Sequence, residues 1–240
     1  MTSAIFITGT DTDVGKTLVS AALLHKCKQF SCSSAAIKPV AAGCEQTTQG
    51  LRNTDALLLQ KFCSLPLSYS EVNPVALTAA IAPHIAAVEQ GSKLSVAQLQ
   101  KPVQQVLDKH AQLTLIEGAG GWLVPLNQKE TLADLAIALK LPVILVVSIR
   151  LGCINHALLT ARAIEVDGLN LIAWVANLNQ GETARFQENI QTLKERIQAP
   201  LLATIPRLSA ADEEAKIIAA SQYIDDDSFQ KILTMSRCDK

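Results

Sequence analysis

The chain has 240 residues, of which 49% are hydrophobic, and its 21 basic and 22 acidic side chains leave a net charge of −1. Such a chain can bury a sizeable core and forms one large domain or two small ones. The balanced charge argues against a basic surface for nucleic acid. Because no apolar run reaches membrane-spanning length and the N-terminus lacks the pattern of a secretory signal, we expect a cytoplasmic protein that acts without a membrane. In that compartment the six cysteines, which include no CxxC pair, are expected to be free thiols.

The first predicted strand, Ala4–Thr8, leads directly into Gly-Thr-Asp-Thr-Asp-Val-Gly-Lys-Thr at residues 9–17. This pattern is typical of a loop that binds nucleotide phosphates, because its glycines allow a tight turn and its backbone N–H groups attract anions. Lys16 is placed to reach the β- and γ-phosphates, and Thr17 to bind Mg²⁺. Five residues separate the two glycines, where the common pattern has four, and a threonine occupies the usual first glycine position. The strand before the loop and a helix predicted over Lys16–Phe30 argue against a chance Gly-Lys-Thr.

Beyond this loop, short apolar runs alternate with segments of helical periodicity. Alternating strand and helix units predict a parallel sheet with right-handed crossovers, whose strands are covered on both faces. We therefore expect a single α/β domain over residues 1–224, with a doubly wound, mostly parallel sheet of the P-loop NTPase type and helices on both faces. Residues 65–91 are expected to be an irregular insertion, and residues 225–240 a weakly specified tail. The remaining predicted elements are, in chain order, strand Ala35–Pro39, helices Thr54–Phe62 and Val96–His110, strand Leu113–Glu117, helix Leu132–Leu139, strand Pro142–Val147, helix Ile154–Val166, strand Leu171–Asn177, helix Thr183–Ile197 and strand Leu201–Ile205.

Ligands of such a sheet bind beyond the carboxyl ends of its strands, so the residues that follow each strand are site candidates. Glu117 ends a strand before a glycine-rich stretch and is either a second Mg²⁺ ligand or an ordinary acid at a strand end. Lys38 ends a buried strand, where its charge needs an anion such as phosphate unless the side chain extends to the surface. Asp55 is either a residue of a helix start or a metal ligand. Asn155 either caps a helix or belongs to a helix N-terminus that binds a substrate carboxylate.

An ordered series of motifs in this chain resembles the dethiobiotin synthetase family, and the likeness extends from about residue 4 to residue 224. A single motif would indicate only the P-loop superfamily, whereas the full ordered set is specific to this synthetase family. The motifs are Gly9-Thr10-Asp11-Thr12-Asp13-Val14-Gly15-Lys16-Thr17, Lys38-Pro39-Val40, Arg52-Asn53-Thr54-Asp55-Ala56, Val72-Asn73-Pro74, Glu117-Gly118-Ala119-Gly120-Gly121, Leu141–Val147, Gly152-Cys153-Ile154-Asn155-His156 and Trp174-Val175-Ala176-Asn177.

The resemblance implies a reaction in which ATP, CO₂ and 7,8-diaminopelargonate give dethiobiotin, ADP and phosphate. One amine captures CO₂ as a carbamate, which attacks the γ-phosphate to form a mixed carbamic–phosphoric anhydride. The second amine then closes the ureido ring and expels phosphate. Phosphoryl transfer of this kind depends on positioning and charge neutralisation more than on covalent chemistry.

The resemblance also implies residue roles. Lys16, Lys38 and Thr12 are expected to be catalytic: Lys16 at the β/γ oxygens, Lys38 at the carbamate and the transferring phosphoryl group, and Thr12 near the γ-phosphate. Mg²⁺ is the expected cofactor, held by Thr17, Asp55 and Glu117. The residues expected to bind ATP are Asp13, Val14, Gly15, Lys16, Thr17, Leu18, Asp55, Glu117, Gly118, Ala119, Gly120, Asn177, Leu178, Ile205, Pro206 and Arg207.

The diamine is expected to contact Lys38, Ala42 and the segment Gly152, Cys153, Ile154 and Asn155. In the family the enzyme is a homodimer, and this segment of one subunit binds the substrate carboxylate at the other subunit's site. Ala42 stands where the family often has serine, so that hydroxyl contact is lost, replaced by backbone, or moved to a neighbour such as Cys44. Ala79-Ala80-Ile81-Ala82 stand where members often carry Glu-Pro-x-Ser. Both departures fall on the substrate side.

Two other classes of protein share parts of this pattern. A dimeric P-loop ATPase that positions division or plasmid machinery would carry an extra lysine early in the phosphate loop, where this chain has Asp11. A related amide-forming ligase with a glutaminase half would need a Cys/His nucleophile pair and more length than this sequence has. The interpretation as a dethiobiotin synthetase therefore explains more of the chain than either alternative.

Overall fold

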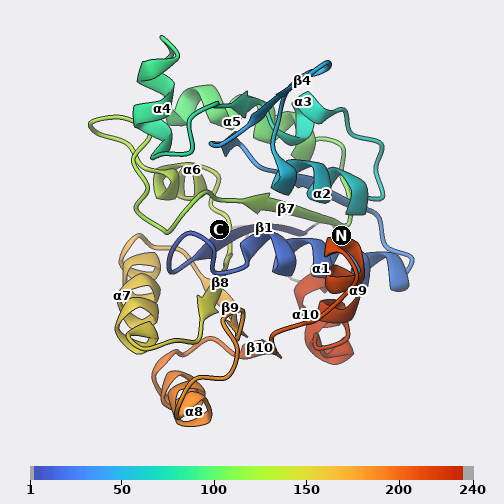
Figure 1. Ribbon diagram of the computed structural model, residues 1–240, viewed down its shortest axis with the longest axis vertical. Coiled ribbons are helices and arrows are strands. Elements are labelled where there is room, and N and C mark those ends of the chain that lie inside the picture. Colours follow the sequence, from blue (N-terminus) through green and yellow to red (C-terminus); the bar gives the residue numbers. More distant parts are fainter. Residues whose placement is uncertain (1–2, 235–240) are drawn as a thin grey trace.

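A six-stranded parallel sheet forms the centre of the computed structural model, which describes residues 3–234 (Figure 1). The strand order is β10-β9-β8-β1-β7-β2, so the strand that carries the phosphate loop lies in the middle of the sheet. The predicted alternation and the parallel sheet are confirmed, because all neighbouring strands pair in parallel. The strands are β1 (Ser3–Gly9), β2 (Ser34–Ile37), β7 (Leu113–Glu117), β8 (Val143–Ser148), β9 (Leu171–Asn177) and β10 (Leu201–Ile205).

Helices cover both faces of this sheet, as predicted. Helices α1, α2 and α9 pack side by side. The crossover that contains α1 runs from β1 towards the β2 edge of the sheet, whereas the crossovers that contain α5, α6, α7 and α8 run towards the β10 edge. Because such crossovers are right-handed, these four helices lie on the face opposite to α1. The bounds are α1 (Lys16–Gln29), α2 (Thr54–Phe62), α5 (Val96–Leu107), α6 (Leu132–Ala138), α7 (Cys153–Val166), α8 (Phe186–Arg196) and α9 (Glu213–Ser221).

Short elements that were not predicted lie both before residues 65–91 and within this stretch, which was expected to be irregular. A two-stranded parallel sheet joins β3 and β6, and β4 and β5 form an antiparallel hairpin. Such short strands carry no usable period, so the sequence could not indicate them. The additional elements are β3 (Val40–Ala41), β4 (Glu45–Thr47), β5 (Gly50–Arg52), α3 (Tyr69–Val72), β6 (Val75–Ala76) and α4 (Pro83–Glu89).

The expectation of a weakly specified tail from residue 225 is corrected by helix α10 (Asp226–Thr234). Its Phe229 is fully buried, and the centre of its ring lies 5.4 Å from that of Phe30, the residue that follows α1. Ser3 at the start of β1 donates its hydroxyl hydrogen bond to backbone oxygens of this helix. Figure 1 shows α10 beside α9, closing the same side of the molecule. Residues 235–240 lie outside the described part of the chain.

The sequence also led to expectations about membrane-spanning helices and about the cysteines. Within residues 3–234, no helix is both long enough and apolar enough to cross a membrane. The described cysteines, Cys27, Cys32, Cys44, Cys63 and Cys153, are free thiols as predicted. Cys238 lies outside the described residues.

Candidate active site

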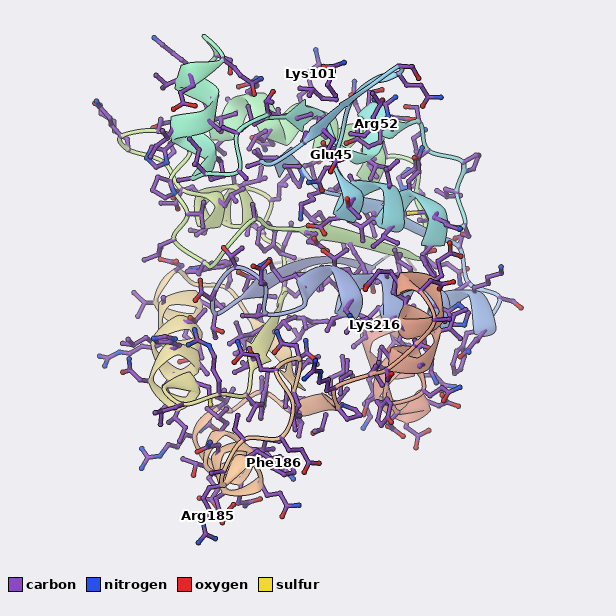
Figure 2. All side chains as sticks on the ribbon, in the orientation of Figure 1. Glu45, Arg52, Lys101, Arg185, Phe186 and Lys216 are labelled. Carbon is purple, nitrogen blue, oxygen red and sulfur yellow. The ribbon has the colours of Figure 1, made fainter. Side chains whose placement is uncertain are left out.

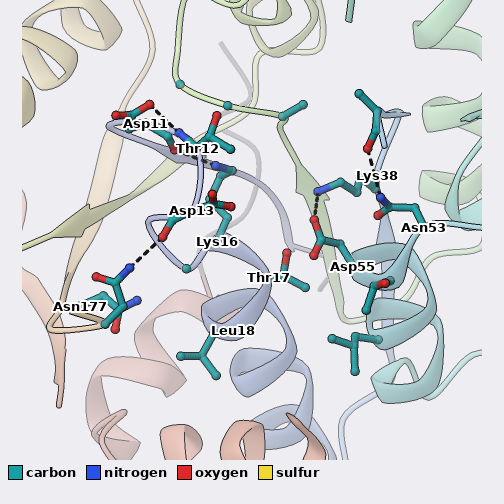
Figure 3. Close-up of a pocket in the computed structure, with 18 of the residues that line it drawn as sticks. Asp11, Thr12, Asp13, Lys16, Thr17, Leu18, Lys38, Asn53, Asp55 and Asn177 are labelled. Atoms are coloured by element: carbon teal, nitrogen blue, oxygen red, sulfur yellow. Dashed lines mark hydrogen bonds and ion pairs between the residues drawn. The ribbon is translucent and has the colours of Figure 1, made fainter. Parts of the chain in front are cut away.

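A cavity of about 1280 Å³ lies beyond the carboxyl ends of the central strands. The phosphate loop between β1 and α1 forms its middle part, with Asn177 at one end and Lys38 at the other (Figure 3). The predicted site residues that line it are Thr12, Asp13, Gly15, Lys16, Thr17, Leu18, Lys38, Ala42, Asp55, Ala119, Gly120, Asn177, Pro206 and Arg207. The other residues expected to bind ATP are buried behind this lining: Val14, Glu117, Leu178 and Ile205 in the core, and Gly118 against the ring of Phe6.

The phosphate loop is held in a defined shape without ligand. Asp13 and Gly15 have positive φ angles of 58° and 95°, which turn the backbone N–H groups of the loop. Asn177, at the end of β9, donates a 2.8 Å hydrogen bond from Nδ2 to the carbonyl oxygen of Val14. Lys16 Nζ donates to the carbonyl oxygen of Asp11 at 3.0 Å, so the cation already points back over the loop.

Helix α1 begins behind this loop with free backbone N–H groups. Among the described residues, no side chain caps its N-terminus, and its first turn carries no acidic residue. The uncapped N–H groups and the positive end of the helix dipole favour an anion at this position. The geometry therefore suits the phosphates of a nucleotide.

The sheet register brings three charged side chains together at the opposite end. Ile37 of β2 pairs with Ile116 of β7, so Lys38 and Glu117 follow at the same level. Lys38 Nζ lies 2.7 Å from both Asp55 Oδ2 and Glu117 Oε1, and Figure 3 shows Lys38 directed at Asp55. Thr17 of α1 donates its hydroxyl hydrogen bond to Glu117 Oε1 at 2.8 Å. These contacts explain how a lysine can lie buried beside the phosphate loop.

The same contacts shift the protonation equilibria. Burial alone would lower the pKa of Lys38, but the charges of Glu117 and Asp55 outweigh it, so the pKa is raised and the cation is retained. For Asp55, burial acts to raise the pKa, and the stronger combined effect of Lys38 and hydrogen bonding lowers it. Burial lowers the pKa of Lys16 to about 8, with partial compensation from Glu117. The cavity thus holds one firmly charged lysine, Lys38, and a second, Lys16, whose pKa is about 8.

The donor set at this point fits a hard divalent cation. Glu117 Oε2 is buried and has no hydrogen-bond partner among the described residues, although a buried carboxylate oxygen normally has one. Thr17 and Asp55 place two further oxygen atoms in the same hydrogen-bond network. Residues 3–234 contain no cluster of three or more His, Cys, Asp or Glu side chains that could hold a metal. Mg²⁺ is typically held by one or two carboxylates together with substrate phosphates and water, so this sparse set is suitable.

The end near Asn177 has features expected of a base-binding site, including residues that the sequence analysis missed. Asn177 Oδ1 is buried and has no hydrogen-bond partner within the described chain. Asn179 accepts from the Ser148 hydroxyl at 2.6 Å and donates to the Asp13 carbonyl oxygen at 2.8 Å, tying strand ends to the phosphate loop. Glu213 and Lys216 also line the cavity. They lie at the start of α9, a helix that was not predicted, so no pattern placed them here.

The substrate end is largely apolar in this chain. Besides Ala42, its lining includes Asn53, Leu123 and the segment 80–83. Asn53 caps α2 by accepting from Ala56 N and donates weakly to the Ala42 carbonyl oxygen. Cys44 is buried and its thiol donates to the Ala41 carbonyl oxygen at 3.4 Å, so it does not replace a serine hydroxyl in the cavity. Cys44 is also absent from the lining of the cavity.

The segment Gly152–Asn155 does not line this cavity. It lies at the N-terminus of α7, which begins after Gly152 with a φ of 91°. Cys153 is buried, while Gly152 and Asn155 are exposed, and Leu151 is 94% exposed. In Figure 1, α7 lies apart from α2, which carries Asp55. One chain therefore does not bring this segment to its own Lys38.

Comparisons with known proteins identify relatives of nearly full length. A family model described as an AAA domain matches residues 3–215. The ATP-dependent dethiobiotin synthetase BioD of Pseudomonas aeruginosa strain UCBPP-PA14 is 56% identical over 222 residues, covering 92% of this chain and 96% of that protein. The BioD of Cellvibrio japonicus is 55% identical over 222 residues, covering 92% and 95%. BioD 1 of Salmonella typhi is 47% identical over 225 residues, covering 94% and 97%.

Solved structures give the fold. The MinC:MinD cell division protein complex of Aquifex aeolicus contains a chain that matches with a TM-score of 0.61 at 15% identity, covering 99% of this chain and 98% of that one. The signal recognition particle receptor FtsY of Elizabethkingia anophelis, in complex with GDP, matches with a TM-score of 0.51 at 16% identity, covering 99% and 65%. At such low identity these likenesses show the fold alone, and they confirm the predicted P-loop α/β class.

Proposed function

Because the chain belongs to the ATP-dependent dethiobiotin synthetase family, we propose that it converts 7,8-diaminopelargonate, CO₂ and ATP to dethiobiotin, ADP and phosphate. It is a ligase that closes a ureido ring by forming carbon–nitrogen bonds, a step of biotin biosynthesis. The observation that carries this proposal is the position of Lys38, whose Nζ lies between two carboxylates in the cavity that the phosphate loop also lines.

The proposed reaction proceeds in three steps. One amine of the diamine attacks CO₂ and loses a proton, forming a carbamate. A carbamate oxygen attacks the γ-phosphorus of ATP, the bond to the β-phosphate oxygen breaks, and ADP leaves. The second amine attacks the carbonyl carbon of the mixed anhydride, loses a proton and expels phosphate, which closes the five-membered ring.

The residues of this chain act by binding and by neutralising charge. Lys16 leaves the Asp11 carbonyl oxygen and binds the β/γ oxygens of ATP. Lys38 contacts the carbamate and the transferring phosphoryl group, and Thr12 donates to the γ-phosphate. Asp55 and Glu117 hold Lys38 in place until these anions arrive. Preorganised donors of this kind supply most of the rate acceleration in phosphoryl transfer.

Mg²⁺ is the cofactor we propose, with Thr17, Asp55 and Glu117 as its protein ligands. When bound, it would neutralise charge on the phosphate oxygens. The buried Glu117 Oε2, which lacks a hydrogen-bond partner in the described structure, supports this assignment. At the other end of the cavity, Asn177 and the segment Ile205–Arg207 would surround the adenine of ATP.

A homodimer with shared active sites is part of the proposal. The exposed position of Gly152–Asn155 supports it, since this segment does not line its own chain's cavity and is accessible to a second subunit. Apolar side chains lie exposed beside this segment and along α7: Leu151 at 94%, Leu159 at 61% and, at the far end of the helix, Val166 at 77%. Burying such side chains between subunits would be favourable. We place the reaction in the cytoplasm, where free thiols such as the five described here persist.

One assay tests the proposal and its strongest alternative. The purified protein is incubated with 7,8-diaminopelargonate, bicarbonate and Mg-ATP, and dethiobiotin and phosphate are measured with and without the diamine. We expect dethiobiotin, and phosphate release that depends on the diamine. Lys38→Leu should keep ATP affinity within about tenfold but lose most of this phosphate release, because a transition-state contact of a few kcal/mol is removed. Fast ATP hydrolysis that ignores the diamine would instead favour a switch ATPase.

A further inference from the structure

Asp11 is the phosphate-loop residue that replaces the extra lysine of switch ATPases, and the proposed mechanism gives its side chain no task. The structure shows two contacts of its carboxylate. Oδ1 accepts a 2.8 Å hydrogen bond from the backbone N–H of Thr12, and Oδ2 lies 3.2 Å from Nη2 of Arg150. Its carbonyl oxygen accepts from Lys16 Nζ. Asp11 therefore contacts two residues that the mechanism assigns to the phosphates, and a third residue from another part of the chain.

Arg150 stands between β8 and the segment Gly152–Asn155. Only Leu151 separates it from Gly152, whose positive φ turns the chain into α7. A second connection runs in parallel, because Ser148 at the end of β8 bonds Asn179, which in turn bonds the Asp13 carbonyl oxygen. The phosphate loop and the start of the substrate segment are thus joined by two side-chain links.

We propose that the Asp11–Arg150 ion pair is a positioning contact that couples nucleotide binding in the phosphate loop to substrate binding by Gly152–Asn155. This inference rests on the proposed function, and it deepens it: in a homodimer that segment serves the neighbouring subunit, so the pair connects the ATP site of one subunit with the diamine site of its partner.

The physical basis is a change of partners at Asp11. ATP draws Lys16 Nζ away from the Asp11 carbonyl oxygen, because the phosphates are the stronger acceptors. Asp11 is then held through its carboxylate, by Thr12 N–H on one oxygen and Arg150 on the other. The pair fixes the chain just before Leu151 and orders the segment for a substrate carboxylate. Nucleotide should therefore tighten diamine binding, and the diamine should tighten nucleotide binding equally.

The pair is partly exposed, with 54% of the Asp11 side chain and 34% of the Arg150 side chain accessible. Exposed pairs contribute modestly, so we expect a coupling of about three- to fivefold in affinity rather than an on–off switch. A residue that acts in this way should change the KM for the diamine more than kcat.

Four variants test the coupling. Asp11→Asn keeps an oxygen for the Thr12 N–H but removes the negative charge, and Arg150→Gln removes the positive charge. The double variant Asp11→Asn/Arg150→Gln completes a double-mutant cycle. Arg150→Lys restores a charge. The matched control is Arg185→Gln, because Arg185 forms a 2.8 Å pair with Glu188 on α8, at the foot of the molecule in Figure 2 and away from the cavity. Thermal melting checks that each variant is folded.

The measurement is the Kd for the diamine by calorimetry, with and without a non-hydrolysable ATP analogue, alongside kcat and KM. The wild type and Arg185→Gln should show a three- to fivefold tightening by the analogue. Asp11→Asn, Arg150→Gln and the double variant should each lose it, without additivity, and Arg150→Lys should recover part of it.

Two results overturn the inference: no tightening in the wild type, or tightening that survives in folded Asp11→Asn and Arg150→Gln. Either result leaves the proposed function intact if the same wild-type preparation makes dethiobiotin. A wild type that makes no dethiobiotin contradicts the proposed function itself.

Discussion

Lys38 Nζ lies 2.7 Å from Glu117 Oε1, with the Glu117 side chain fully buried. The two residues follow paired positions on adjacent strands, Ile37 of β2 and Ile116 of β7, so the sheet register itself creates the contact. A carboxylate in such a position is tolerated only because a cation lies against it. In the ligand-free protein, Lys38 therefore stabilises this end of the cavity.

Replacing Lys38 should consequently affect stability as well as turnover. Lys38→Met leaves Glu117 buried without its cation, and removal of one partner from a buried pair costs about 3–5 kcal/mol of unfolding free energy. The double variant Lys38→Met/Glu117→Gln removes both charges and should recover most of that loss. Urea unfolding in the presence of EDTA measures the unfolding free energy of both variants. Equal stability of Lys38→Met and wild type would show that the pair does not stabilise the fold.

Gly15 provides a second test, of close packing in the phosphate loop. A Cβ at this position would lie 2.1 Å from Asn177 Nδ2, so Gly15→Ala must displace the side chain that orients Val14. We expect ADP affinity to fall at least about tenfold, equivalent to 1.4 kcal/mol of binding free energy. Gly91→Ala is the matched control, because Gly91 also has a positive φ, 68°, but its Cβ would meet no atom within 4 Å among the described residues. If both variants bound ADP normally, close packing against Asn177 would not matter.

The sequence predicted the parts of this fold that carry a period or a spacing. All six central strands are apolar runs covered on both faces, and the phosphate loop has a fixed spacing, so both were predicted in place. Helix α9 was missed because its buried residues are few, and with it Glu213 and Lys216. Helix α10 was missed because the burial of Phe229 depends on Phe30, which is remote in sequence.

For the same reason, side-chain contacts between residues that are distant in the chain could not be predicted from the sequence. Lys38 was expected to need an anion such as phosphate, and no carboxylate partner was predicted for it. The structure shows Asp55 and Glu117 already in that position, which requires the register of β2 and β7. The Asp11–Arg150 pair joins residues 139 positions apart, and no local pattern predicts it.

The pKa of Lys16 predicts how nucleotide binding depends on pH. Burial lowers this pKa to about 8, and bound phosphates must raise it again. At a pH between the pKa of Lys16 in the free protein and its higher pKa in the complex, nucleotide binding is accompanied by protonation of Lys16. The affinity for nucleotide should therefore fall as the pH rises from 7.5 to 9.5, by up to about tenfold per pH unit above pH 8. Calorimetry of ADP in EDTA, in buffers of different ionisation enthalpy, measures both affinity and proton uptake. Lys16→Ala should bind weakly at every pH, without this uptake, whereas a flat wild-type profile would contradict the argument.

The proposed shared active site gives a further prediction. Lys16 lines the cavity, whereas Asn155 lies exposed at the start of α7 and does not reach it within one chain. Lys16→Ala should reduce turnover of the homodimer about a hundred- to a thousandfold, because a charge-stabilising group is removed. Asn155→Ala should also reduce it strongly, because a proposed contact to the substrate carboxylate is lost. In a mixed dimer, one cavity receives an intact Lys16 from the Asn155→Ala subunit and an intact Asn155 from the Lys16→Ala subunit.

Mixing the two variants in equal amounts should therefore restore activity. Random exchange makes half of the dimers mixed, and each mixed dimer has one complete site of two, so about a quarter of wild-type activity is expected for isologous pairing. The control is a mixture of each variant with the inactive Lys16→Ala/Asn155→Ala chain, which cannot form a complete site. Subunit exchange is verified with differently tagged chains. If exchange occurs and activity stays at the level of this control, Lys16 and Asn155 act in the same subunit, and the shared-site arrangement is wrong.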